Sequence, residues 1–206
     1  MIYFCADDYG ISAEANLCIE TCLKNGILNK ISVLPNGEIS ELEKCLSIED
    51  KTLALHLNLI EGKPLSSTSD INMLASEDGF FKYSFIGLFL MSLSPKRKKL
   101  KEEIYKELQK QIRFWKDTIK DKYIFSIDSH QHTHMIPLVF KTLMRVIEDE
   151  GIDVSYIRIP AEPILPYVLT PSLYFSYSLV GIIKQWLLKY FAFLNKKELK
   201  KSKIQS

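Results

Sequence analysis

Five short apolar runs, separated by segments with helical periodicity, are the feature that most constrains how this chain can fold. We expect the five strands to lie at residues 2–6, 31–34, 52–57, 123–128 and 154–159. Three segments carry helix caps or apolar positions spaced as on one helix face, at residues 12–26, 94–115 and 137–151. Strands that alternate with helices favour an α/β fold with a parallel sheet. The pattern alone does not separate an open sheet from a barrel.

Three other segments complete this outline. Ser40 and Glu43 form a capping box that predicts a short helix. Residues 63–93 are expected to be irregular, and such a long loop in a compact domain suggests a cover over a site. Residues 179–194 have apolar positions at helical spacing and predict a helix with one continuously apolar face.

Chain length and charge indicate how many domains to expect and which partners to exclude. Its 206 residues suit one domain, which we expect over residues 1–195, followed by a disordered lysine-rich tail at 196–206. The net charge of +2 gives no reason to expect nucleic-acid binding. We interpret the uncharged segment 164–183, which contains prolines, as a loop running into a helix and not as a transmembrane span.

The cysteines and the N-terminus both favour a cytoplasmic protein. Cys5, Cys18, Cys22 and Cys45 all lie in the first quarter of the chain, a distribution unlike a disulfide framework. The first residues have no positively charged region, so no signal peptide is expected.

Polar side chains follow three of the predicted strands. Asp7 and Asp8 come after the first, His56 and Asn58 end the third, and the segment 128–134 ends the fourth. Ligands of parallel α/β folds bind at this carboxyl edge of the sheet. Taken alone, His56 resembles a core histidine and Asp7-Asp8 a solvated turn. Together, the three clusters indicate a metal site.

The residue types suggest how such a site would work. Imidazoles and a carboxylate suit Zn²⁺, with Mg²⁺, Co²⁺ and Ni²⁺ as further candidates. Successive residues that leave a strand point in different directions, so one of Asp7 and Asp8 can bind a metal while the other addresses a water. A carboxylate beside metal-activated water can act as a general base.

The histidine cluster offers several candidate residues. If the chain stays extended, Asp128, His130 and His132 lie on one side. We prefer His130 as the metal ligand because it is nearest the strand end, and we expect Asp128 to orient an imidazole. His132 and His134 are expected to line the substrate cleft. Arg158 at the last strand would hold a substrate group or form a structural ion pair.

Four motifs in order resemble the YdjC-like deacetylase family. They are FCADDYG, LALHLNLIEGKPL, FSIDSHQHTHMIP and GIDVSYIRIPAEP, and the similarity covers residues 1–165. The resemblance implies a distorted β/α barrel, a divalent metal such as Mg²⁺ or Zn²⁺, and hydrolysis of an N-acetyl group on an amino sugar or oligosaccharide. It places Asp8, His56 and His130 at the metal positions and Asp7 at the general-base position.

The sequence departs from the family at its end. Family members continue to a late Glu and a His-Pro-Gly motif, which this sequence lacks. The resemblance therefore predicts a barrel that is incomplete at the C-terminus, an uncovered apolar face at 179–194 and self-association into a homo-oligomer. Two further hypotheses stay open: another metal-dependent hydrolase such as a phosphoesterase, and a catalytically impaired remnant that binds metal or sugar.

Overall fold

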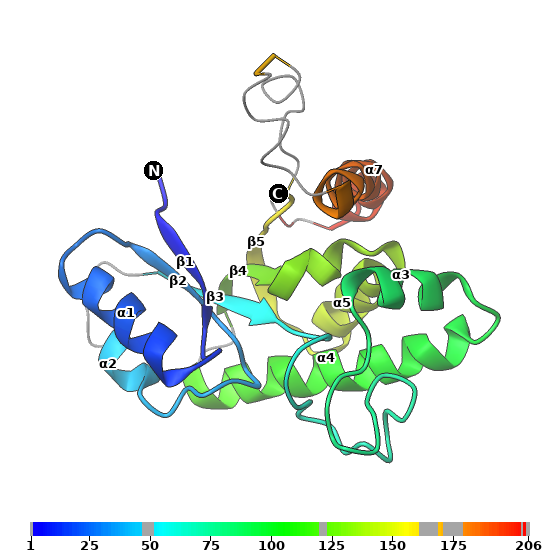
Figure 1. Ribbon diagram of the computed structural model, residues 1–206, viewed down its shortest axis with the longest axis horizontal. Coiled ribbons are helices and arrows are strands. Elements are labelled where there is room, and N and C mark those ends of the chain that lie inside the picture. The colour runs from blue at the N-terminus through cyan, green and yellow to red at the C-terminus, as the bar shows by residue number, and fades with distance from the viewer. Residues whose placement is uncertain are drawn as a thin grey trace.

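Five parallel strands, paired in the order of the chain, form the central sheet (Figure 1). The computed structural model describes residues 2–46, 52–119, 123–160, 169–170, 179–202 and 204. The strands are β1 (Cys5–Tyr9), β2 (Lys30–Val33), β3 (Thr52–Leu57), β4 (Tyr123–Ser129) and β5 (Asp153–Ile157). In a β/α barrel, parallel strands also pair in the order in which they occur along the chain. Within the described residues, however, β1 and β5 do not pair, so the sheet is open. The predicted α/β class is confirmed.

The two faces of the sheet differ in chemistry. Ile31 pairs in register with Leu53, and Leu55 with Ile127, so these apolar side chains share one face. His56 pairs with Asp128 on the opposite face. Side chains alternate between faces along a strand, which explains why a histidine stands in the apolar run of β3.

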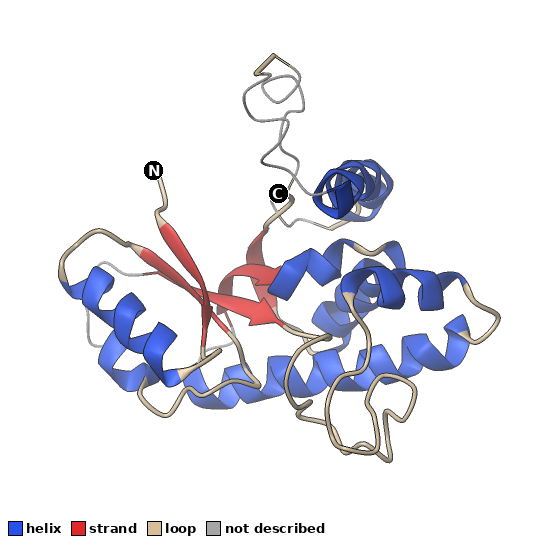
Figure 2. Cartoon of the chain, viewed as in Figure 1, coloured by secondary structure: helices blue, strands red, loops and turns tan. Residues whose placement is uncertain are grey.

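The helices follow the predicted segments (Figure 2). Ser12 caps α1, its hydroxyl accepting from the Ala15 N–H at 3.2 Å, and Gly26 follows the helix with φ of 74°. The main core joins the apolar sheet face to α4 and α5 through buried side chains that include Leu55, Ile127, Ile104, Leu108, Val139 and Leu143. The remaining bounds are α1 (Ala13–Lys24), α2 (Leu42–Leu46), α3 (Phe85–Leu93), α4 (Arg97–Ile119), the 3₁₀ helix η1 (His130–Met135), α5 (Pro137–Asp149) and α7 (Leu179–Leu199).

Helix α3 corrects the expectation that residues 63–93 are irregular throughout. The Ser84 hydroxyl accepts from the Gly87 N–H at 3.2 Å and starts the helix. Its nine residues carry no charge, so no polar face revealed a helical period in the sequence. Phe85 and Leu88 are buried, and α3 packs on α4.

Between β3 and α3, the chain is fastened to α4 by two buried carboxylates. Glu107 and Glu103 each accept two backbone N–H groups at 2.8–3.0 Å, from Leu65, Ser66, Met73 and Leu74. Backbone donors satisfy these charges without a solvent contact. The segment that was expected to cover a site is therefore fixed against a long helix.

Helix α7 packs on α5 and η1, and it also contacts α3. Phe191 belongs to the face predicted to be uncovered, but it is buried and lies 5.0 Å from Phe89, ring centre to ring centre. Ile182, Trp186 and Tyr190 are exposed, with Trp186 at 60%. The predicted apolar stripe is thus divided between the core and the surface.

The C-terminal expectations are only partly covered by the structure. Helix α7 continues to the buried Leu199, so the tail boundary expected at residue 196 moves to the end of this helix. None of the helices in the described ranges has the length and apolar character needed to cross a bilayer. Glu162 of the fourth motif and most of segment 164–183 lie outside the described residues.

Candidate metal and catalytic site

The polar clusters meet at the carboxyl end of the sheet, where the backbone takes unusual conformations. Asp8, Gln131 and His132 have φ of 66°, 51° and 63°, the positive values found among the described non-glycine residues. Such left-handed residues are uncommon and cluster at functional sites. At Asp8 the register of β1 shifts between Ala6 and Tyr9, which turns the carboxylate out of the normal strand alternation.

Close contact between two turns fixes the loop after Asp8. A Cβ added to Gly37 would lie 2.4 Å from the Gly10 carbonyl oxygen, so only glycine fits. The Glu38 N–H donates to the same oxygen at 2.7 Å. Asn16 of α1 bridges the turns, accepting from the Gly10 N–H and donating to the Glu38 carbonyl. The turn at Gly10, which follows Asp8, is therefore fixed by both α1 and the loop at Gly37 and Glu38.

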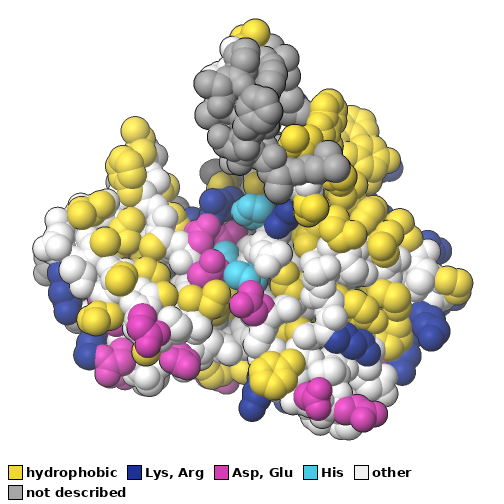
Figure 3. Space-filling view, in the orientation of Figure 1, with side chains coloured by type: hydrophobic (Ala, Val, Ile, Leu, Met, Phe, Trp, Pro, Cys, Tyr) yellow, Lys and Arg dark blue, Asp and Glu magenta, His cyan; other side chains and the backbone are white. Residues whose placement is uncertain are grey.

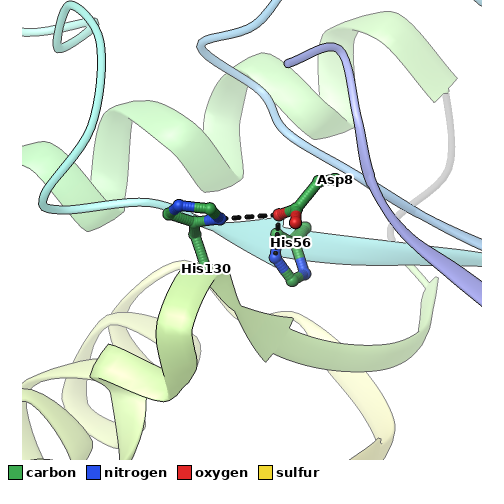
Figure 4. Close-up of side chains that lie close together, drawn as sticks. All are labelled: Asp8, His56 and His130. Carbon is green, nitrogen blue, oxygen red and sulfur yellow. Dashed lines mark hydrogen bonds and ion pairs between the residues drawn. The ribbon is translucent and has the colours of Figure 1, made fainter. Parts of the chain in front are cut away.

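Asp8, His56 and His130 converge as the sequence suggested (Figure 4). The Asp8 Oδ1 atom lies 2.9 Å from His56 Nε2 and 2.6 Å from His130 Nδ1. One ligand-type atom from each residue falls within 4.8 Å of the others. Two imidazoles and one carboxylate are a donor set that suits a divalent cation with positions left for water or substrate.

Each imidazole also contacts a second carboxylate through the ring nitrogen that faces away from Asp8. His56 Nδ1 lies 2.6 Å from Asp128 Oδ1, to which the Ser32 hydroxyl also donates. His130 Nε2 lies 2.7 Å from Glu61 Oε2. Each ring thus directs one nitrogen toward Asp8 and the other toward a second carboxylate, the pattern of metal-binding histidines.

Electrostatics follow from this arrangement. Burial by itself would lower the pKa of His56, but the carboxylates of Asp128 and Asp8 raise it to about 9. The hydrogen bond to Asp8, opposed by burial, raises the pKa of His130 as well. The hydrogen bonds from His130 and His56 lower the pKa of Asp8. Without a metal, the His56 imidazole is therefore predominantly protonated at neutral pH.

Asp7 and Arg158 form an ion pair at the edge of the site. Arg158 donates from one guanidinium nitrogen to Asp7 Oδ2 at 2.7 Å and to Asp128 Oδ2 at 3.3 Å. The Cys5 thiol lies 3.3 Å from the other Asp7 oxygen. Of the two roles expected for Arg158, the structural ion pair is present. A carboxylate oxygen of Asp7 also lies within 4.8 Å of ligand-type atoms of His56 and Asp128.

The histidines after His130 do not continue an extended strand. The left-handed backbone of Gln131 and His132 instead turns the chain into η1. His134, expected in the substrate cleft, is 1% exposed, with Nδ1 2.6 Å from the Ser129 hydroxyl and Nε2 2.8 Å from the Arg158 carbonyl oxygen. His134 therefore serves the packing of β4 against β5. His132 is half-buried, and burial lowers its pKa to about 4. Among the described residues, its Nδ1 has no hydrogen-bond partner.

A cleft of about 400 Å³ opens beside His130. Figure 3 shows histidine side chains in this hollow between acidic groups. Its described lining includes Glu38, Glu61, Asn36 and the half-exposed Phe80, but no Lys or Arg. The cleft is thus acidic, with one aromatic ring.

Sequence reasoning missed Glu61 and Ser32 as parts of this site. Glu61 lies in the motif LALHLNLIEGKPL and follows a histidine-bearing strand by four residues, so its position was a usable signal. Ser32 stands in an apolar run and carries no signal until the sheet register places it beside His56.

A family model and a curated relative match this chain. A family model described as YdjC-like protein matches residues 1–205. A curated carbohydrate deacetylase from Danio rerio is 31% identical over 158 residues, covering 76% of this chain and 49% of that protein. This chain therefore spans about half the length of that relative.

A solved structure supports the fold. A protein named for cellobiose-phosphate cleavage, from Enterococcus faecalis V583, superposes with a TM-score of 0.59 at 21% sequence identity. The match covers 73% of this chain and 56% of that one. At this identity, the likeness concerns the fold alone.

Proposed function

This chain belongs to the YdjC-like protein family, and from that membership we propose that it is a metal-dependent carbohydrate deacetylase. Its substrate would be an N-acetylated amino sugar or oligosaccharide. The curated relative named carbohydrate deacetylase, 31% identical over 158 residues, supports this assignment. A cytoplasmic location stays a prediction from the cysteine pattern.

The convergence of Asp8, His56 and His130 is the observation that carries the proposal. All three present a ligand-type atom to one point, and both rings are braced by carboxylates on their far nitrogens. This donor set fits a divalent ion such as Zn²⁺ or Mg²⁺, which would supply a Lewis acid for the acetyl carbonyl and for a water. Removing the metal should therefore abolish turnover.

The remaining site residues would handle the proton. Asp7 stands next to Asp8 in sequence, and we assign it the role of base that removes a proton from the attacking water. Arg158 holds one Asp7 oxygen at 2.7 Å, which fixes the direction in which the carboxylate can accept. Substrate binding would have to preserve this pair or exchange it for a substrate contact.

The cleft favours a neutral sugar over a phosphate ester. Its described lining carries two carboxylates and no Lys or Arg, and the Lys63 ammonium lies 5.4 Å from the centre of the Phe80 ring. A phosphate dianion would be repelled by these carboxylates, whereas sugar hydroxyls can donate to Glu38. Phe80 offers an apolar surface for a sugar ring.

Acetate release tests the proposal. The protein, loaded in turn with Zn²⁺, Mg²⁺ and Co²⁺, is incubated with N-acetyl-chitooligosaccharides and with p-nitrophenyl phosphate. We expect acetate from the first substrate only, and none after chelation or in His56→Ala. Phosphate release without acetate would instead support the phosphoesterase hypothesis, and metal binding without either product would indicate an impaired remnant.

A further inference from the structure

Glu61 contacts the imidazole of a proposed metal ligand on the side away from the metal position. Its Oε2 lies 2.7 Å from His130 Nε2, while His130 Nδ1 lies 2.6 Å from Asp8. Figure 4 shows the ring with one nitrogen toward Asp8 and the other pointing away from it. The far nitrogen is therefore taken by Glu61, and the near one is left for a cation.

The same relation exists at the other imidazole. His56 directs Nε2 toward Asp8 and holds Asp128 through Nδ1 at 2.6 Å. Two rings that come from different strand ends are thus oriented by two separate carboxylates. Asp128 is buried and fixed by the sheet, whereas the Glu61 side chain is 54% exposed and must be held by its own backbone.

An asparagine turn fixes that backbone. Asn58 Oδ1 accepts from the N–H groups of Ile60 and Glu61, both at 3.1 Å. Asn58 Nδ2 donates to the Glu61 carbonyl at 2.7 Å. Three hydrogen bonds from one buried amide leave the Glu61 backbone little freedom.

Helix α4 anchors this turn from within the core. Gln111 is fully buried, and its amide accepts from the Asn58 N–H at 3.0 Å and donates to the Asn58 carbonyl at 2.6 Å. The same amide donates to Glu107 at 2.8 Å. The buried chain Glu107–Gln111–Asn58 thus ends at Glu61, and fully paired polar networks of this kind rigidify what they hold.

We propose that Glu61 is a positioning residue: its contact with His130 Nε2 orients the ring so that Nδ1 can bind the metal. The inference rests on the metal site of the proposed function. A carboxylate on the far nitrogen fixes the ring orientation and the tautomer and makes the near nitrogen a better ligand. Loss of Glu61 should therefore weaken metal binding even though Glu61 does not itself contact the metal.

Metal affinity is the direct test. Chelator competition with Zn²⁺ gives Kd for the wild type, Glu61→Ala, Glu61→Gln and the control Glu77→Gln, an exposed carboxylate of the same segment. We expect Glu61→Ala to raise Kd by about 10- to 100-fold. Glu61→Gln keeps a neutral acceptor and should recover part of the affinity. Glu77→Gln should bind as the wild type does.

A spectroscopic reading separates ligand geometry from stability. The visible absorption of bound Co²⁺ should change in Glu61→Ala and return toward the wild-type band in Glu61→Gln, while metal-free thermal unfolding stays within the range of the control. Unchanged Zn²⁺ affinity and an unchanged Co²⁺ band, with KM alone raised, would show that Glu61 contacts substrate and would overturn the inference. If the wild type binds metal but releases no acetate, the proposed function fails while the role of Glu61 is still decided by the affinities.

Discussion

Raising the pH should destabilise the metal-free protein, and His56 sets the size of the effect. Its pKa is about 9 in the fold and about 6.5 in an unfolded chain. A group whose pKa is raised by folding stabilises the protein fully below its unfolded pKa and loses that contribution as the pH passes its folded pKa. The difference of about 2.5 in pKa corresponds to about 3 kcal/mol lost between about pH 6.5 and pH 9.5.

The neighbouring groups define the rest of the pH profile. His130, whose pKa is raised in the same direction, adds to the loss at alkaline pH. Asp8 and Asp128 have lowered pKa values, so their contribution is present above about pH 4 and is lost as the pH falls. Burial lowers the pKa values of His132 and His134 to about 4, so the stability that these neutral rings contribute is lost as the pH falls below about 6.5. The metal-free protein should therefore be most stable near about pH 6.5.

Urea unfolding in the presence of a chelator, followed by tryptophan fluorescence at several pH values, measures this effect. His56→Gln removes the titrating ring, and Asp128→Asn removes a carboxylate that raises its pKa, so both should flatten the alkaline limb. With Zn²⁺ bound the sign should reverse, because ligand imidazoles must be neutral and metal affinity rises with pH. A wild-type unfolding free energy that stays constant from pH 6.5 to 9.5, or a full alkaline loss in His56→Gln, would refute the reasoning.

Other perturbations address catalysis, the cover segment and the surface. Asp7→Asn should keep Zn²⁺ affinity but lower kcat by about 10²–10⁴-fold, whereas Asp8→Asn should lose metal affinity. Equal loss of Zn²⁺ binding in both variants, measured by metal titration, would contradict the assignment of Asp7 as base and Asp8 as metal ligand. Glu107→Ala leaves the N–H groups of Leu65 and Ser66 without their acceptor and should lower the unfolding free energy by about 1–3 kcal/mol in urea titrations. No change would mean that water replaces the carboxylate. Trp186→Ser on the exposed face of α7 should reduce self-association of the 206-residue chain in light scattering, and a monodisperse wild-type monomer would contradict that expectation.

Local patterns predicted most of the secondary structure because they report backbone preference directly. The run TLALHL corresponds to β3 residue for residue, and Ser12 with Gly26 bound α1 as expected. Helix α3 was missed because an uncharged segment shows no amphipathic period. The turn at Gln131 and His132 was missed because left-handed backbone in non-glycine residues has no reliable sequence signal.

The donor types of the site were readable from the chain, because carboxylates and imidazoles placed at strand ends must meet at one edge of a parallel sheet. The pair Asp7-Asp8, His56 and His130 could thus be named as a group without knowing any distance between them, and the family resemblance selected Asp8 from the pair. Their metal binding is a proposal that the convergence supports.

The contacts that brace the group were decided only by the tertiary structure. Asp128 lies 72 residues from His56 and Arg158 lies 151 residues from Asp7, and each pair meets because sheet pairing places the strand ends side by side. The burial of His134 and the approach of Glu61 depend in the same way on packing between distant segments. Sequence spacing determines which groups are available, whereas the register of the sheet and the anchoring on α4 determine which of them touch.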